Sequence, residues 1–238
     1  VGSEMCIRDR VQAADLAASG ALEPMIDKAA ELVAAHLDLG AIEAAFTVIA
    51  APAAGRALLP PPGQRIAIAR DAAFGFSYEH LMAGWRDADA EIMSFSPLAD
   101  EAPPPNADFI FLPGGYPELH LPELSRAGNF LGGLRAAAER GTRIYGECGG
   151  YMVLGEAIID AEGASYPMAG LLALETSFAN RKLHLGYRRM TPLAQAWPGL
   201  EPVTGHEFHY TSATRAEGDP LFAVREAAGR DLGTRGLG

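Results

Sequence analysis

Short apolar runs alternate with amphipathic stretches along residues 65 to 148. Runs rich in Ile, Phe and Ala predict strands, and stretches with apolar residues at helical spacing predict helices between them. The alternation implies right-handed crossovers and a mostly parallel sheet with helices on both faces, so an α/β fold is expected. The predicted strands cover 65–70, 91–95, 107–115 (ending in a glycine turn) and 142–148, and the predicted helices cover 76–88 and 129–141.

The segment before this region has a different pattern. Residues 12–46 are rich in Ala and Leu, and apolar residues around Ile26 and Leu32 recur at helical spacing, which predicts one or two helices. Residues 51–64 include three consecutive prolines and predict a linker with a domain boundary near residue 63.

Two further stretches complete the chain. Residues 1–10 lack an initiator methionine and match no pattern that continues, so they are expected to be extraneous. Beyond residue 165 the pattern becomes more β-like, and strands are expected in 182–190 and 203–213.

Composition narrows the classes of partner. The formal net charge of −11 comes without any run of Lys or Arg, which argues against a nucleic acid or an anionic membrane as the partner. Two cysteines and no spaced Cys/His set exclude a disulfide framework and favour a protein with no bound metal in a reducing cytoplasm. No apolar stretch is long enough to span a membrane.

The second cysteine, Cys148, lies in the pentapeptide Gly146-Glu147-Cys148-Gly149-Gly150, after a predicted strand and before a helix-like run. A glycine two residues before and two residues after a nucleophile is the pattern of a nucleophile elbow, a strained turn that exposes the side chain. A position at a helix N-terminus favours the thiolate, the reactive form. The alternative is a small, buried, unreactive cysteine.

A second glycine loop, residues 113–118 with the sequence PGGYPE, follows the neighbouring predicted strand. Ligands of open α/β sheets bind at the carboxyl ends of the strands, where both loops fall. Gly114 and Gly115 let backbone amides approach a ligand closely, so together with Gly149 they could form an oxyanion hole. A simple turn after a buried strand is the alternative.

A cysteine nucleophile also needs a general base, which is usually a histidine. In the segment GHEFHY, His206 faces one side of a predicted strand and His209 faces the other. Each is a candidate base or a structural histidine. The spacing is HExH, without the two-histidine helical spacing of HExxH, so a zinc protease is not indicated. The other histidines have no motif around them: His36, His80, His120 and His184.

PGGYPE, YGECGGYMVLGEA and GHEFHY, in this order on an α/β pattern, resemble the class I glutamine amidotransferases with their flavodoxin-like fold. They are more closely similar to the glutaminase domain of the cobyrinic and hydrogenobyrinic acid a,c-diamide synthases, corrin-amidating enzymes of cobalamin biosynthesis. By this resemblance, 65–238 is the amidotransferase domain, and 11–50 is the helical remnant of a preceding P-loop, dethiobiotin-synthetase-like ATPase domain.

The resemblance also implies the chemistry. Cys148 attacks the side-chain amide of glutamine, and Gly115 and Gly149 stabilise the oxyanion. Ammonia passes to the protein's own ATPase domain, which uses ATP and Mg²⁺ to activate the a and c carboxylates of a corrinoid precursor. The phosphate-binding loop G-x-x-x-x-G-K-[ST] does not occur in this chain.

In the family, the catalytic histidine belongs to a terminal G-S-F-F-H-like strand, and this chain stops before such a strand. The domain is therefore expected to be truncated and inactive alone, with His206 and His209 as contact or structural residues. Three other functions stay open: a cobyric acid synthase, another class I amidotransferase such as a cell-wall enzyme, and a non-catalytic α/β binding module. A homodimer is also left open.

Overall fold

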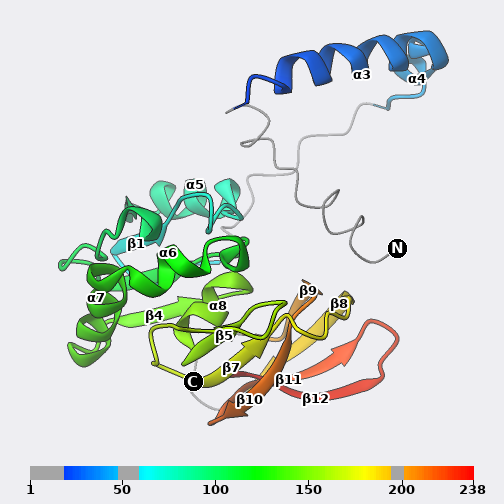
Figure 1. Cartoon of the computed structure of the whole chain (residues 1–238). Coiled ribbons are helices and arrows are strands. Elements are labelled where there is room, and N and C mark those ends of the chain that lie inside the picture. The colour runs from blue at the N-terminus through cyan, green and yellow to red at the C-terminus, as the bar shows by residue number, and fades with distance from the viewer. Residues whose placement is uncertain (1–18, 48–58, 194–200) are drawn as a thin grey trace. The chain divides into compact units, whose positions relative to one another are not determined.

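The computed structural model describes residues 19–47, 59–193 and 201–238, and the chain forms two compact units (Figure 1). The first unit covers residues 1–56 and the second covers 57–238. The division falls inside the predicted linker 51–64, most of which lies outside the described residues, as does the predicted extraneous segment 1–10.

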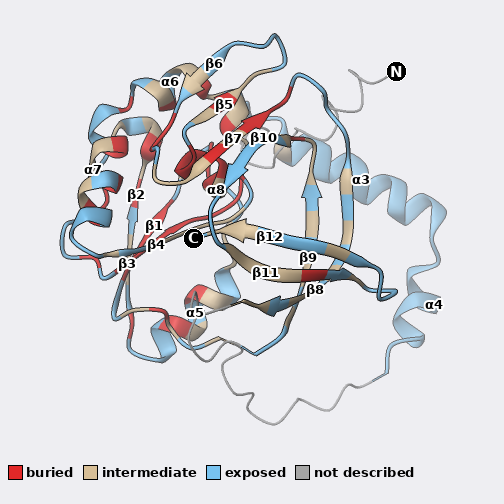
Figure 2. Cartoon of the chain, turned by 90° about the horizontal axis from the view of Figure 1, so that it is seen from below, coloured by how far each residue is buried: buried red, intermediate tan, exposed pale blue. Residues whose placement is uncertain are grey.

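The described part of the first unit holds two helices, α3 (Leu22–His36) and α4 (Leu39–Ala44), so the predicted helical character of this segment is confirmed. Neither helix has a buried residue, and Ile26 and Leu32 are about half exposed (Figure 2). An amphipathic helix derives most of its stability from packing its apolar side. The described residues of this unit, 19–47, do not provide that packing.

The second unit contains a parallel sheet of four strands in the order β2-β1-β3-β4. All three pairings are parallel, and Ile66 of β1 lies opposite Ile92 of β2 and Phe109 of β3. The expected parallel sheet is therefore confirmed for this part of the chain. Its strands are β1 (Arg65–Ala69), β2 (Glu91–Phe95), β3 (Phe109–Leu112) and β4 (Arg143–Gly146).

Helices cover this sheet. One predicted helix is shorter than expected, because Phe76 donates its amide hydrogen to the carbonyl of Gly114 at 3.0 Å and pairs with it as an isolated β-bridge. The prediction that residues 76–78 are helical is therefore wrong. The helices are α5 (Glu79–Asp87), α6 (Leu121–Arg126), α7 (Gly128–Glu139) and α8 (Gly149–Leu154), with 3-10 turns η1 (Pro97–Ala99) and η2 (Pro117–Leu119).

Alternate residues of the central strands are buried on opposite faces of the sheet. Ile66 and Ile68 pack with Met82 and Trp85 of α5, whereas Ala67 belongs to the larger cluster formed with α6, α7 and α8. Because successive side chains of a strand point to opposite faces, both faces of β1 are buried and the strand is apolar from Ile66 to Ala69. Helices on both faces are therefore confirmed for this sheet.

The rest of the second unit is mostly β-structure, in two further four-stranded sheets (Figure 1). Their orders are β10-β7-β5-β6 and β12-β11-β8-β9, and all their pairings except β5 with β7 are antiparallel. The expected mostly parallel sheet thus ends at β4. The strands are β5 (Ala157–Ile159), β6 (Ser165–Pro167), β7 (Ala173–Ser177), β8 (His184–Pro192), β9 (Val203–His209), β10 (Ser212–Glu217), β11 (Pro220–Glu226) and β12 (Asp231–Leu237).

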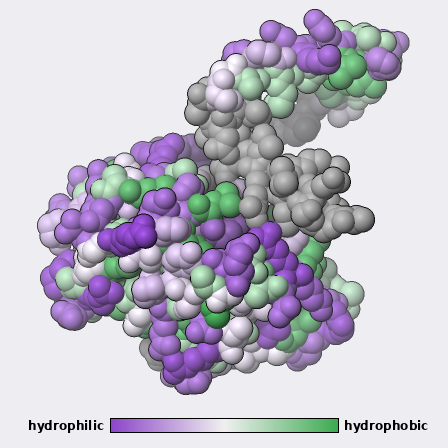
Figure 3. All heavy atoms as spheres, viewed as in Figure 1, coloured by the Kyte–Doolittle hydropathy of each residue, from purple (hydrophilic) through white to green (hydrophobic). Residues whose placement is uncertain are grey.

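The surface of the second unit mixes polar and apolar residues. On the face shown in Figure 3, hydrophilic residues occupy much of the area, with hydrophobic residues between them. Among the described helices, none combines the length and hydropathy that crossing a bilayer requires.

The core beneath α7 provides a test of the packing. Leu134 of α7 is fully buried, whereas Leu185 of β8 is 64% exposed. We expect Leu134→Ala to lower the free energy of unfolding by about 3 kcal/mol, since it removes buried methyl groups and leaves a cavity. Leu185→Ala is the matched control and should change it by less than about 1 kcal/mol. Chemical denaturation of both variants measures the difference, and equal effects would contradict this assignment of the core.

Candidate active site

The structure places Cys148 in a tight turn between β4 and α8. Strand β4 ends at Gly146, and Cys148 is the residue immediately before the first residue of the helix, Gly149. Its backbone has φ 49° and ψ −114°. A positive φ is uncommon for a residue with a side chain, and such conformations are concentrated at functional sites. The turn therefore has the strained strand-to-helix geometry expected of a nucleophile elbow.

Two glycines make this turn possible. A Cβ atom on Gly150 would clash with the backbone carbonyl of Leu112 at the end of β3. A Cβ atom on Gly146 would lie 2.7 Å from the carbonyl group of Gly150, closer than real Cβ contacts. Side chains at these positions would therefore separate the helix from the sheet and open the turn.

Two backbone amides face the sulfur of Cys148. The N–H groups of Gly149 and Gly115 hydrogen-bond the thiolate form, which places the PGG loop beside the turn as the sequence predicts. Gly115 can approach because it has no Cβ, which would clash with the carbonyl of Ala73. Gly114 holds the loop through its carbonyl, which accepts from Phe76. Two converging amides are the arrangement that stabilises an oxyanion.

The pKa of the Cys148 thiol is nevertheless raised above its usual value. Burial is the main cause, the amides of Gly149 and Gly115 act against it, and the carboxylates of Glu118 and Glu147 raise the pKa further. The two amides act in the direction expected for this position, which favours thiolate, whereas burial and the two carboxylates act against it. Because Cys148 is still exposed to solvent, its desolvation is only partial.

Glu147, the residue before the nucleophile, is also perturbed. Burial raises its pKa to about 7, and a hydrogen bond with the side chain of Tyr78 lowers it in part. The pKa of Tyr78 is raised in turn by burial and by the charge of Glu147. Glu147 therefore changes its charge near neutral pH, and its charge acts on the adjacent sulfur.

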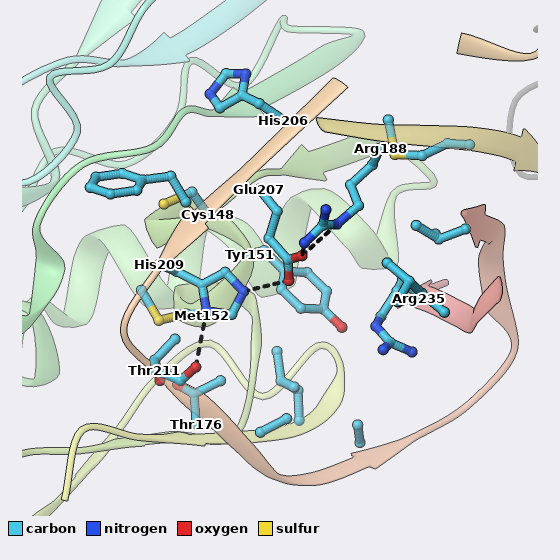
Figure 4. A pocket seen from close by; sticks show the side chains of 17 residues that line it. Cys148, Tyr151, Met152, Thr176, Arg188, His206, Glu207, His209, Thr211 and Arg235 are labelled. Atoms are coloured by element: carbon cyan, nitrogen blue, oxygen red, sulfur yellow. Dashed lines mark hydrogen bonds and ion pairs between the residues drawn. The ribbon is translucent and has the colours of Figure 1, made fainter. Parts of the chain in front are cut away.

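Cys148 lines a pocket of about 340 Å³ in the second unit (Figure 4). Helix α8 forms one side of it, and strands β8 and β9 contribute four of the polar or ionisable side chains. This volume lies near the lower end of the roughly 300–1,000 Å³ found for ligand pockets, which suits a small molecule. The polar or ionisable side chains that line it are Cys148, Tyr151, Thr176, Arg188, His206, Glu207, His209, Thr211 and Arg235.

Strand β9 alternates as predicted. His206 is exposed, whereas Glu207 and His209 are half-buried on the other side of the strand, and Figure 4 shows His206 pointing away from them. The Glu207 carboxylate lies between the guanidinium of Arg188 and the imidazole of His209. Its Oε2 is 2.6 Å from Nη2 of Arg188, and its Oε1 is 2.9 Å from Nε2 of His209.

His209 has an acceptor at each ring nitrogen. Nδ1 lies 2.9 Å from the carbonyl oxygen of Thr211, and Nε2 faces the Glu207 carboxylate. A carbonyl oxygen and an ionised carboxylate oxygen are both hydrogen-bond acceptors. The ring also stacks on His184 at a centroid distance of 4.7 Å. In this arrangement both ring nitrogens of His209 are engaged, one with Thr211 and one with Glu207.

Comparison with known proteins places this geometry in a family. The model of the CobB/CobQ-like glutamine amidotransferase domain matches residues 65–237. The chain belongs to this family.

Several curated relatives of this chain are named hydrogenobyrinate a,c-diamide synthase. The protein from Rhizobium meliloti (strain 1021) is 56% identical over 220 residues, which cover 92% of this chain and 51% of that protein. The Sinorhizobium sp protein is 57% identical over 91% of this chain and 50% of its own length, and the Rhodobacter capsulatus protein is 49% identical over 90% and 49%. The chain therefore spans about half the length of these relatives.

Two solved structures also resemble the amidotransferase. One, titled as the crystal structure of a glutamine amidotransferase, has 16% identity and a TM-score of 0.46, covering 68% of this chain and 84% of that one. PurLQS from Thermotoga maritima has 17% identity and a TM-score of 0.44, covering 71% and 77%. The family assignment rests on the domain model and the curated relatives.

The amidotransferase fold brings together most of the residues singled out in the sequence. Cys148, His206 and His209 line one pocket, and Gly115 and Gly149 face the sulfur. His184 lies beside the pocket through its stacking on His209. The remaining histidines are found in α3 (His36), in α5 (His80) and at the end of η2 (His120), and none of these lines the pocket.

Sequence reasoning missed three residues of this site. Arg188 could not be predicted from the sequence, because its contact with Glu207 joins β8 to β9 and depends on the register of the two strands. Thr176 gives no pattern in the sequence, yet its hydroxyl is buried without a hydrogen-bond partner in the described part of the chain. Glu147 is adjacent to the nucleophile, and a carboxylate in that position of a buried turn is the signal that could have marked it.

One side-chain group among the described residues could hold a metal ion. Ligand atoms of His184, Glu207 and His209 lie within 4.8 Å of one another. The Glu207 carboxylate already has hydrogen-bonding partners in Arg188 and His209, so its oxygens are satisfied without a metal ion. The geometry therefore does not require a metal ion.

The carboxylates near the sulfur provide a pH-dependent test. Glu118→Gln and Glu147→Gln each remove a negative charge that raises the pKa of Cys148, so each should lower that pKa and speed alkylation near pH 8. Alkylation rates of Cys148, measured from pH 6 to 10 by mass spectrometry, give the midpoint of its ionisation. Glu123→Gln, on the exposed side of α6, is the control. Midpoints equal to that of the unmodified protein in both variants would contradict the electrostatic account.

Proposed function

We propose that this chain is the glutamine-hydrolysing half of an ATP-dependent amidoligase that amidates the a and c carboxylates of hydrogenobyrinic acid. One observation carries the glutaminase part: the amides of Gly115 and Gly149 converge on Cys148 at a strained turn. The names of relatives that are 49–57% identical to the chain support the acceptor. The relatives are about twice as long, so the ligase activity belongs to the full-length protein.

The proposed reaction begins with the Cys148 thiolate attacking the side-chain carbonyl carbon of glutamine. The carbonyl oxygen becomes an oxyanion, which accepts hydrogen bonds from the amides of Gly115 and Gly149. The tetrahedral intermediate collapses when the amide nitrogen takes a proton and leaves as ammonia, and a γ-glutamyl thioester forms on the sulfur. Water then attacks the thioester, which releases glutamate and restores the thiol.

The thiol proton needs an acceptor. His209 is an unsuitable one, because both of its ring nitrogens face oxygen acceptors. His206 lines the pocket and is exposed, so it is the available histidine within this chain. The alternative is a histidine in the part of the full-length protein that this chain does not include, as the resemblance to the family implies.

ATP and Mg²⁺ would activate the acceptor carboxylate in such an amidoligase. The residues of this chain do not fit that role, because no phosphate-binding loop occurs in its sequence. We therefore assign ATP binding to the rest of the full-length protein. The alignment with the relatives covers more of this chain than the amidotransferase domain, which supports the first unit as part of a preceding domain.

A diazo-ketone analogue of glutamine tests the glutaminase assignment. We expect mass spectrometry to find an adduct on Cys148 and none on Cys6, the chain's other cysteine, because attack requires the glutamine side chain to sit against the two amides. Iodoacetamide, which needs no glutamine site, labels accessible thiols and provides the control. A second preparation should carry the full-length sequence. Absence of an adduct on Cys148 in both would favour a non-catalytic α/β module.

A further inference from the structure

We propose that Arg188 and Glu207 recognise the α-carboxylate and the α-ammonium of glutamine, with Thr176 as a further hydrogen-bonding group. The proposal rests on the glutaminase function given above and adds how the substrate is selected. These side chains line the same pocket as Cys148. Glutamine carries an uncharged amide at one end and two opposite charges at the other, so its site requires both kinds of surface.

The pocket provides the two kinds of surface at separate places. Around Cys148, the amides of Gly115 and Gly149 suit the carbonyl oxygen of the substrate's side chain. Strands β8 and β9 supply the charged side chains Arg188 and Glu207 (Figure 4). The volume of about 340 Å³ suits an amino acid.

Arg188 and Glu207 hold each other in place and still have hydrogen-bonding capacity. The guanidinium uses Nε and Nη2 for Glu207 and one hydrogen of Nη1 for the carbonyl of Tyr187. One hydrogen on each Nη atom is left to donate to a carboxylate. Oε2 of Glu207 already accepts from Nε and Nη2 of Arg188, whereas Oε1 faces only His209 and has one further lone-pair site for an ammonium group.

The local sequence creates space for this pair. Gly186 lies directly opposite Glu207 in the β8–β9 pairing, and Arg188 comes two residues later on the same side of β8. A Cβ atom on Gly186 would clash with the guanidinium of Arg188. The missing side chain lets Arg188 extend back along the strand to reach Glu207 across the hairpin.

Thr176 is the independent observation that points to a ligand. Its side chain lines the pocket, the residue is only 3% exposed, and its hydroxyl has no hydrogen-bond partner among the residues that the structure describes. A buried hydroxyl without a partner is costly, so such groups call for an explanation. A polar group of bound glutamine would supply the missing partner.

The test uses ligands that lack one charged group each. Glutaramate is glutamine without its α-ammonium, and γ-aminobutyramide is glutamine without its α-carboxylate. For each ligand, the concentration that slows alkylation of Cys148 by iodoacetamide by half is measured by mass spectrometry, with Cys6 as the internal reference. In the unmodified protein, glutamine should bind roughly 10- to 100-fold more tightly than either truncated ligand.

Each variant should lose one preference only. Glu207→Gln should bind glutamine and glutaramate with affinities within about 3-fold of each other. It should keep its preference for glutamine over γ-aminobutyramide. Arg188→Gln should bind glutamine and γ-aminobutyramide within about 3-fold of each other and keep its preference for glutamine over glutaramate. Arg215→Gln, which removes an arginine outside the pocket, should behave like the unmodified protein. Equal loss for all three ligands in both variants, or unchanged preferences, would overturn the proposal.

Thr176→Val separates a ligand contact from a structural role. The change removes a hydroxyl without a partner and keeps the shape, so the melting temperature should stay equal or rise. Glutamine protection should weaken about 5-fold or more. Lower stability with unchanged protection would contradict the role of Thr176. If the diazo-ketone labels Cys148 while the ligand preferences are absent, only this inference fails, because the glutaminase function does not depend on it.

Discussion

The close packing of helix α8 against the end of strand β3 is the constraint on which the candidate active site depends. The amide of Glu147 donates to the carbonyl of Leu112 at 3.1 Å, and Gly150 lies against the same carbonyl. The chain between β4 and α8 must therefore turn within two residues, which forces Cys148 to a positive φ. Such strain costs about 1–3 kcal/mol and persists only where the surrounding packing is strong. Leu112 and Val153, both fully buried, supply that packing.

The same constraint brings the second loop to the sulfur. Strands β3 and β4 are parallel neighbours with Leu112 opposite Gly146, so the loops that follow them begin side by side. Gly114 is tied by its carbonyl to Phe76, and Gly115 lies against the backbone of Ala73, in the segment after β1. Three strand ends thus fix the amides that face Cys148, at the carboxyl edge where ligands of parallel sheets bind.

The sequence was informative where local pattern and tertiary structure agree. The apolar runs of β1 and β3 are buried on both faces, so these strands could be recognised, and the Gly-Cys-Gly spacing marked the turn at Cys148. Residues 76–78 were misassigned because Phe76 pairs with Gly114, a contact that local periodicity does not contain. The two later sheets could be recognised as β-structure but not ordered, since strands far apart in the sequence pair in them.

The candidate site was predictable to a similar extent. Period-two alternation correctly separated His206 from Glu207 and His209. The partners of Glu207 were not predictable, because the opposition of Gly186 and Glu207 depends on hairpin register, and Arg188 reaches Glu207 only because position 186 has no side chain. The pKa of Cys148 was also beyond the sequence, since its direction depends on how burial and two carboxylates balance two amides.

That balance bears on where the site stabilises negative charge. Burial, Glu118 and Glu147 disfavour a charge on the sulfur, and the amides of Gly115 and Gly149 only partly offset them. A charge on the carbonyl oxygen of a bound substrate would meet the same amides, which accelerates the reaction when the interaction is stronger in the transition state than in the resting protein. The raised thiol pKa thus makes a proton acceptor necessary. His209 cannot serve while Glu207 and Thr211 occupy its ring nitrogens.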